Sequence, residues 1–148
     1  MIVRVAVPAD VTAASRREPP GAEPALGHGA RRRAGEATYL VAREDDEVIG
    51  GVLVARGELR HLRVDSRARG RGVGTALIAA AEDLLREQGH DHATLGVDLG
   101  NHRARALYLR LGYVATGRTE TVSYTYVADD GTRRRATETN EELCKNLR

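Results

Sequence analysis

The chain has 148 residues, long enough for one domain with one core, and 41% of them are hydrophobic, an ordinary share for a globular protein. It contains no Phe and no Trp, so the core must be built from aliphatic side chains. No apolar run approaches the roughly 20 residues of a membrane-spanning helix, and Met1-Ile2-Val3-Arg4 does not begin a signal peptide, so we expect a cytoplasmic protein without a membrane partner.

Charge, cysteine and histidine content indicate which partners and which bound groups to expect. The formal net charge is only +2, although triple-arginine runs stand at 31–33 and 133–135. We interpret both runs as solvated surface arginines, so nucleic acid is not an expected partner. Cys144 is the single cysteine, which excludes an internal disulfide. The histidines show no metal-ligand spacing, and we expect no metal.

The first part of the chain predicts a strand, a loop and a hairpin. Residues 2–7 form a short β run that ends at Pro8, and Asp10 or Thr12 is suited to cap a short helix. Residues 18–35 are rich in proline and glycine and predict a long loop. The apolar runs 39–43 and 48–55 lie on either side of Asp45-Asp46, which predicts an antiparallel hairpin.

A strand over 58–64 then leads into a glycine-rich turn and a helix. Residues 69–74 read Arg-Gly-Arg-Gly-Val-Gly, and the helix is predicted over 72–88, closed by Gly89. Its apolar stripe consists of Ala76, Leu77, Ala80, Ala81, Leu84 and Leu85. Glycines adopt angles that other residues avoid and let an anion approach the amides at a helix N-terminus. The pattern predicts a phosphate site, with an ordinary tight turn as the alternative.

The rest of the chain predicts alternating strands and one more helix. A strand is expected over 92–97 and a helix over 101–111, with Asn101 as its N-cap and Gly112 at its C-terminal end. Strands over 113–115 and 120–127 precede a hairpin turn at Asp130-Gly131. The last strand lies within 132–147, although 140–146 could instead be helical. This order predicts a single α/β (α+β) domain over 1–148 with a mixed sheet.

Two motifs resemble those of the GCN5-related N-acetyltransferase (GNAT) family. The family pattern [Gln/Arg]-x-x-Gly-x-[Gly/Ala] is matched as Arg69-x-x-Gly72-x-Gly74, after the usual preamble Leu62-Arg63-Val64-Asp65. The second match is Asn101-x-x-Ala104-x-Ala106-Leu107-Tyr108-x-x-Leu111-Gly112-Tyr113. The likeness extends from residue 1 to about residue 117. It implies the GNAT fold, a mixed sheet of six or seven strands flanked by helices and splayed between the fourth and fifth strands, with acetyl-CoA in the splay.

The resemblance also implies which residues bind acetyl-CoA. Backbone groups of Leu62, Arg63 and Val64 would bond the pantetheine arm as if it were an added strand. Asn101 would bond a pantetheine amide, unless it only caps its helix. The pyrophosphate would lie on the amides of the turn, namely those of Arg69, Gly70, Arg71, Gly72, Val73, Gly74 and Thr75.

For catalysis, the resemblance implies direct transfer of the acetyl group from the thioester to an amine. The amide of Val64 would polarise the carbonyl, and Tyr108 would protonate the departing sulfur, unless it only packs. Glu58, six residues before Val64, is the expected base. His61 and solvent are the alternatives, and His61 alternates onto the opposite face unless a bulge intervenes. Gly96 stands where ribosomal-protein acetyltransferases of the family carry a glutamate base.

The acceptor is expected to be the amine of a small molecule or a peptide, bound by residues 16–38 and 117–139 in the manner of the family. Arginines in both segments favour an acceptor with carboxylate or phosphate groups, and a homodimer is compatible with the sequence. Two other functions stay open at this point. One is a non-catalytic acetyl-CoA-binding module, and the other is an RNA-directed acetyltransferase that modifies aminoacyl-tRNA.

Overall fold

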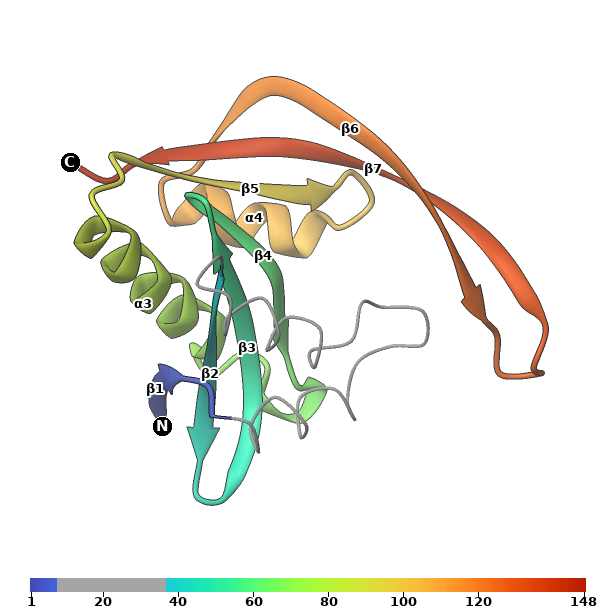
Figure 1. The fold of residues 1–148 in the computed structure, drawn as a ribbon, viewed down its shortest axis with the longest axis horizontal. Coiled ribbons are helices and arrows are strands. Elements are labelled where there is room, and N and C mark those ends of the chain that lie inside the picture. The colour runs from blue at the N-terminus through green and yellow to red at the C-terminus, as the bar shows by residue number, and fades with distance from the viewer. Residues whose placement is uncertain (8–36) are drawn as a thin grey trace. The chain divides into compact units, whose positions relative to one another are not determined.

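The computed structural model describes residues 1–7 and 37–148 (Figure 1). The predicted cap at Asp10 or Thr12, the predicted loop over 18–35 and the arginine run 31–33 lie outside the described residues. Within the described part, seven strands follow the sheet order β1-β2-β3-β4-β5-β7-β6. The predicted mixed sheet of six or seven strands is therefore confirmed. The splay and the single domain stay predictions.

The described residues divide into two compact units, which are taken in turn. Residues 1–7, 37–93 and 146–148 belong to the first, and residues 94–145 belong to the second. Among the described residues, no helix is both long and apolar enough to cross a membrane.

Strands β1 (Ile2–Val5), β2 (Ala37–Glu44), β3 (Glu47–Ala55) and β4 (Glu58–Val64) of the first unit are antiparallel neighbours. The predicted hairpin around Asp45-Asp46 is confirmed as β2 and β3, and β4 has the predicted bounds. β3 is buried from Val48 to Val54, so both faces of this strand are covered.

One face of these strands packs against α3 (Val73–Glu87). A Cβ built on Gly50 would lie 3.1 Å from Leu77 Cδ1 and 3.3 Å from Val73 Cγ1, so the helix approaches β3 closely where no side chain intervenes. The opposite face carries an apolar cluster made of Ala6, Ala37, Tyr39, Val41, Val48 and Leu53.

The buried stripe of α3 differs in part from its prediction. Its buried residues are Val73, Leu77, Ile78, Ala81, Glu82 and Leu85. Ala76, Ala80 and Leu84 were expected in the stripe and are only half-buried. The contact face is rotated toward Val73 and Ile78, because the larger β-branched side chains fill the interface in place of the alanines.

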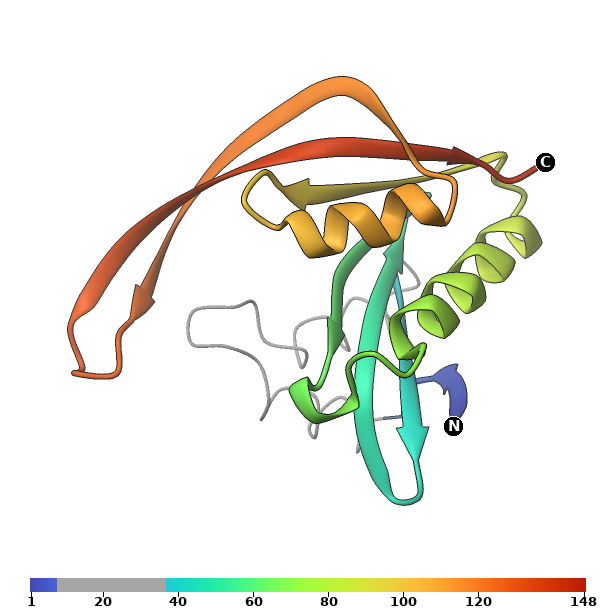
Figure 2. The ribbon, with the colours of Figure 1, turned by 180° about the vertical axis from the view of Figure 1, so that it is seen from behind.

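The second unit contains most of β5 (His92–Asp98), followed by α4 (His102–Arg110), β6 (Val114–Val127) and β7 (Arg133–Asn146). α4 runs alongside β5 in both views (Figures 1 and 2). The helix confirms the expectation over 101–111, with Asn101 at its N-cap.

β6 and β7 form a long antiparallel hairpin (Figure 2). β6 is one strand, whereas two separate strands over 113–115 and 120–127 were expected. The register shifts between Ala115 and Thr119, and Gly117 there has φ +89°, so a bulge takes the place of the predicted break. The helical alternative for 140–146 is wrong, because Leu143 and Cys144 pair with β6.

Candidate cofactor and acetyl-transfer site

β4 is followed by a short 3-10 helix, Ser66–Ala68, and then by the glycine-rich turn, which opens α3. Gly70 and Gly72 have φ of +76° and +83°, and Gly72 is the N-cap of the helix. A Cβ built on either glycine would meet nothing within 4 Å, so the backbone angle, and not crowding, requires glycine here. The first amides of α3 have no intrahelical acceptor, and its first turn carries no acidic residue. This open, uncapped helix start fits an anionic group such as a phosphate.

The arginines of this turn are held by neighbouring groups. Arg71 Nη2 lies 3.1 Å from Glu44 Oε1, and Arg67 Nη2 lies 2.6 Å from Glu47 Oε2. Arg69 Nε donates to the Val64 carbonyl at 3.4 Å. The two acids flank the β2–β3 turn, and their approach to the glycine-rich turn was not predicted. No local sequence signal indicates it, since 27 residues separate Glu44 from Arg71.

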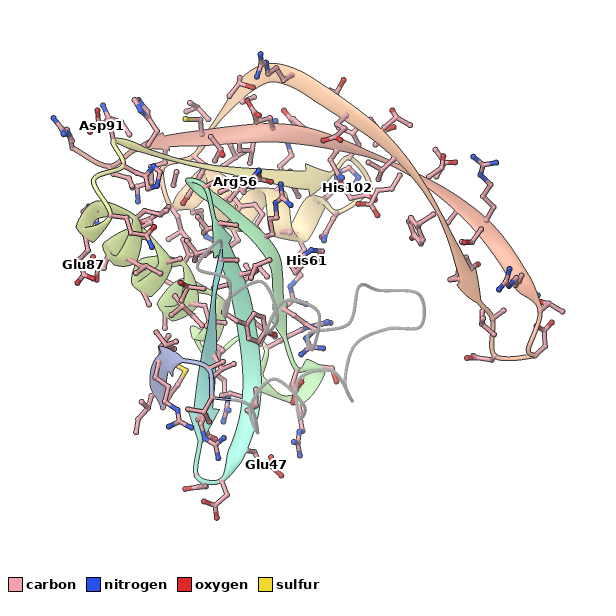
Figure 3. All side chains as sticks on the ribbon, in the orientation of Figure 1. Glu47, Arg56, His61, Glu87, Asp91 and His102 are labelled. Atoms are coloured by element: carbon pink, nitrogen blue, oxygen red, sulfur yellow. The ribbon has the colours of Figure 1, made fainter. Side chains whose placement is uncertain are left out.

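A bulge interrupts β4 at His61, which is labelled in Figure 3 and has φ +53°. Arg60 pairs with Leu53 and Arg63 pairs with Gly51, so His61 and Leu62 together face the single residue Val52. His61 was expected on the opposite face from Glu58 unless a bulge intervened, and this bulge is present. Strict alternation between the two faces of the strand therefore does not apply to His61.

The register also defines which side chains share a face of β4. Glu58, Arg60 and Arg63 pair with Ala55, Leu53 and Gly51, which alternate along one face of β3. Gly50 belongs to the opposite face, which α3 covers. We refer to Glu58, Arg60 and Arg63 as the acid–arginine row.

Glu58, the expected base, is engaged by its neighbour in this row. Arg60 Nη2 donates to Oε2 at 3.2 Å, and Arg60 Nε lies 3.2 Å from Oε1. The side chains of Arg60 and Glu58 are 43% and 36% exposed, so water and substrate compete with this pair. Each carboxylate oxygen has a second lone pair, so Glu58 can accept a proton from an amine while it remains in contact with Arg60.

Asn101 has the predicted capping role. Its Oδ1 accepts a hydrogen bond from the backbone amide of Ala104 at 3.1 Å. The backbone amide of Asn101 donates to the Asp98 carbonyl at 2.9 Å. The oxygen of the side chain is thus used by the helix, while the side-chain nitrogen is a donor suited to a ligand carbonyl.

Tyr108 lies on the same helix and is 7% exposed. Its ring packs edge-on against Tyr113, with the centroids 6.1 Å apart. Burial raises the pKa of Tyr108 to about 12. At neutral pH the hydroxyl therefore keeps its proton and acts as a donor.

An ion pair that was not predicted ties α4 to β7. Arg105 Nε lies 2.9 Å from Glu141 Oε2, and a second contact joins Nη2 to Oε1 at 3.4 Å. The hydrogen bond between them raises the pKa of Arg105 and lowers the pKa of Glu141. The partners are 36 residues apart, which is why no local pattern indicated them.

The structure thus brings the predicted residues together in two sets. β4 and the glycine-rich turn lie in the first unit, and Asn101 and Tyr108 lie on α4 of the second. Their action on one cofactor stays a prediction.

The arginine run 133–135 begins β7 and is exposed. Its members pair with Val127, Tyr126 and Thr125 in turn, so their side chains alternate between the two faces of the hairpin. Arg134 also pairs with Asp130 at 3.1 Å. Among the described residues, no three His, Cys, Asp or Glu side chains are grouped so that they could hold a metal ion.

Comparison with known proteins points to one family. A model described as the acetyltransferase (GNAT) family matches residues 9–113. The chain is 40% identical over 82 residues to a mycothiol acetyltransferase of Clavibacter sepedonicus, a match that covers 52% of this chain and 27% of that protein. The match therefore covers little more than a quarter of the length of this curated relative.

Solved structures show the same fold. The ribosomal-protein-S18-alanine N-acetyltransferase from Escherichia coli has a TM-score of 0.73 at 20% identity, covering 99% of this chain and 93% of that chain. The PaiA N-acetyltransferase from Thermoplasma acidophilum, in complex with coenzyme A, has a TM-score of 0.61 at 17% identity, with 82% and 68% covered. The predicted GNAT fold is thereby confirmed.

Proposed function

Because this chain belongs to the GNAT acetyltransferase family, we propose that it is an N-acetyltransferase that moves the acetyl group of acetyl-CoA to a primary amine. The observation that carries the proposal is the uncapped start of α3, opened by Gly72 after β4 and a short 3-10 helix. It supplies amides and a positive dipole end for the pyrophosphate of the donor. The likeness to an acetyltransferase fold solved with coenzyme A supports the same donor.

Each set of site residues has a binding role in this proposal. The amides from Arg69 to Thr75 hold the pyrophosphate, and Arg71 contacts it by exchanging Glu44 for a phosphate oxygen. The backbone of Leu62–Val64, which begins within the bulge, pairs with the pantetheine arm as an added strand. The side-chain nitrogen of Asn101 donates to a pantetheine carbonyl while its oxygen caps α4.

The chemistry then needs three contributions from the protein. Acetyl-CoA supplies a thioester, and the amine nitrogen forms the new C–N bond as the C–S bond breaks. The Val64 amide donates to the carbonyl oxygen as negative charge develops there. Tyr108, kept protonated by its raised pKa, donates a proton to the departing sulfur.

The third contribution is removal of the amine proton, for which we propose Glu58. Glu58→Gln keeps the size of the side chain and removes the proton acceptor, so the rate should fall and the acidic limb of the pH–rate profile should shift or vanish. His61→Gln is the matched variant on the same strand. Loss of the neutral limb in His61→Gln with a silent Glu58→Gln would move the base to His61, and two silent variants would assign it to solvent.

The function is tested by acetyl-CoA-dependent thiol release with a panel of primary amines, together with calorimetric binding of acetyl-CoA. We expect tight binding and amine-dependent release of free CoA. Binding without turnover of any amine would replace the enzyme by a non-catalytic acetyl-CoA-binding module. Salt-dependent retention of RNA, with turnover only on aminoacyl-tRNA, would favour the RNA-directed alternative.

A further inference from the structure

The acid–arginine row of β4 carries more positive than negative charge. Arg60 and Arg63 share the face with one carboxylate, that of Glu58. Arg60 already contacts both oxygens of Glu58, with a hydrogen bond to Oε2 and an ion-pair contact to Oε1. Arg63 is therefore left without a compensating charge within the row.

Arg63 also holds a buried nitrogen that lacks a hydrogen bond. Among the side chains of the described residues, its Nη1 is the buried polar atom without a hydrogen-bond partner. A guanidinium stays charged at any ordinary pH, so it cannot relieve this state by losing a proton. A buried charged donor is costly to leave unpaired, and such a group in a folded protein indicates a missing partner.

The surroundings of Arg63 favour an anion as that partner. Gly51, directly across the ladder, has no side chain, and the Tyr39 hydroxyl lies over it: a Cβ added to Gly51 would stand 2.5 Å from that oxygen. Arg63 and Tyr39 are thus both neighbours of Gly51. The guanidinium of Arg63 is the charged donor here, and a guanidinium binds a carboxylate through two parallel hydrogen bonds.

We propose that the Arg63 guanidinium binds a carboxylate of the acceptor, so that the preferred acceptor is a small amine that also carries a carboxylate group. This inference rests on the proposed function. Val64, the next residue, is the one whose amide polarises the thioester carbonyl. An acceptor anchored on Arg63 therefore has its amine only a few bonds from its carboxylate.

The phosphates of acetyl-CoA are the other possible source of an anion. They are expected at the start of α3, the helix that covers the opposite face of the ladder from the acid–arginine row. For this reason we assign the carboxylate of the acceptor, and not a phosphate of the donor, to Arg63.

The test compares ω-amino acids of increasing length, from glycine to 6-aminohexanoate, with the amides of the same acids. The wild type should prefer the acid of the best length over its amide by about tenfold to a hundredfold in kcat/KM, the usual range for a hydrogen bond to a charged group. Arg63→Gln should lose this preference mainly through a higher KM for the acid. Arg63→Lys should retain part of it, because the charge remains.

Arg56→Gln is the matched control, since Arg56 is an exposed arginine on the turn of the same β3–β4 hairpin. It should keep the preference for the acid. Circular dichroism and calorimetric acetyl-CoA binding establish that each variant is folded and binds its donor.

Three results would overturn the assignment. Equal turnover of acids and amides by the wild type would do so while leaving the proposed function intact, because transfer itself is observed. Weaker acetyl-CoA binding in Arg63→Gln with an unchanged preference would assign Arg63 to a donor phosphate. If no amine is turned over, the proposed function fails separately from this assignment. The carboxylate site is then tested by titrating the wild type and Arg63→Gln with 4-aminobutyrate and following the NMR chemical shifts of the protein. Shift changes that are lost in Arg63→Gln support the carboxylate site, and identical changes in both proteins overturn it.

Discussion

The two long hairpins of this protein are both antiparallel ladders, yet they differ in almost every physical respect. β3, in the first hairpin, is buried over seven consecutive residues, with α3 on one face and an apolar cluster on the other. β6, in the second, is exposed along nearly its whole length, with only Val122 and Tyr126 half-buried. Hydroxyl pairs such as Thr121–Thr139, at 3.0 Å, join its strands.

This difference separates two tasks. The buried hairpin fixes β4 and the glycine-rich turn, because both are tied to β3 by the ladder and by close packing of α3. The exposed hairpin can change its side chains at little cost in stability, since few of them are packed. We therefore expect the first hairpin to determine how the donor is held and the second to tolerate variation.

The largest expected effect lies at Tyr108 in the second unit, the unit that also contains the exposed hairpin. Exposure of that hairpin therefore does not make the whole second unit tolerant of change. Tyr108→Phe should lower kcat about 100-fold or more, with little change in acetyl-CoA affinity, because the hydroxyl acts on charge that develops at sulfur. The raised pKa of about 12 predicts no kinetic limb from Tyr108 at neutral pH. An unchanged kcat would leave Tyr108 as a packing residue.

The same pKa has a consequence for stability with a definite sign. The folded value of about 12 lies above the ordinary 10, so the neutral hydroxyl is favoured in the folded state. The stabilisation is fully present below pH 10 and is lost as the pH rises through 12. The difference in phenolate absorbance between the wild type and Tyr108→Phe over this pH range gives the pKa of Tyr108, and hence this contribution to stability.

The second prediction makes one chemical change in each hairpin. Val52 in β3 is fully buried, whereas Val127 in β6 is 54% exposed. Val52→Ala should lower the free energy of unfolding by about 2 kcal/mol, from lost burial and the cavity left behind, and Val127→Ala by less than about 0.5 kcal/mol. Denaturant titration gives both values, and equal losses would contradict the contrast between the hairpins.

The third prediction makes the same substitution, glycine to valine, once in the turn before α3 and once in β6. Gly72 and Gly117 have φ of +83° and +89°, and a Cβ on either would meet nothing within 4 Å. Valine at either position should therefore lower stability by a similar amount, about 1–2 kcal/mol. Only Gly72→Val should weaken acetyl-CoA binding, by at least about tenfold, because its side chain stands where the phosphate approaches. Wild-type affinity in a folded Gly72→Val variant would refute the phosphate site.

The sequence predicted well what local patterns determine. The bounds of β4, the start of α3 within one residue of its prediction and the Asn101 cap each follow from residues within a few positions. Features set by distant partners could not be predicted in this way. The pairing of Arg71 with Glu44 depends on where the β2–β3 turn lies in space, and the unpaired Nη1 of Arg63 depends on what covers it.

The exposed hairpin was predicted least accurately for a related reason. Two strands, 113–115 and 120–127, were predicted on either side of Gly117. In the structure Gly117 has φ +89° and lies in a bulge within one continuous strand. Residues 140–146 carry no clean alternation, and their strand is determined by pairing with β6.

The smallest expected effect concerns the ion pair of Arg105 and Glu141, which ties α4 to the base of the exposed hairpin. The hydrogen bond from Arg105 lowers the pKa of Glu141 below its ordinary 4.5, so the charged carboxylate is favoured in the folded state. Its contribution to stability is present above pH 4.5 and is lost as the pH falls through the lowered value. Glu141→Gln should therefore give a slightly lower melting temperature at neutral pH and a smaller loss on acidification. Glu120→Gln, on the neighbouring strand, is the control and should change neither, so equal behaviour of the two variants would show that the ion pair does not hold α4 in place.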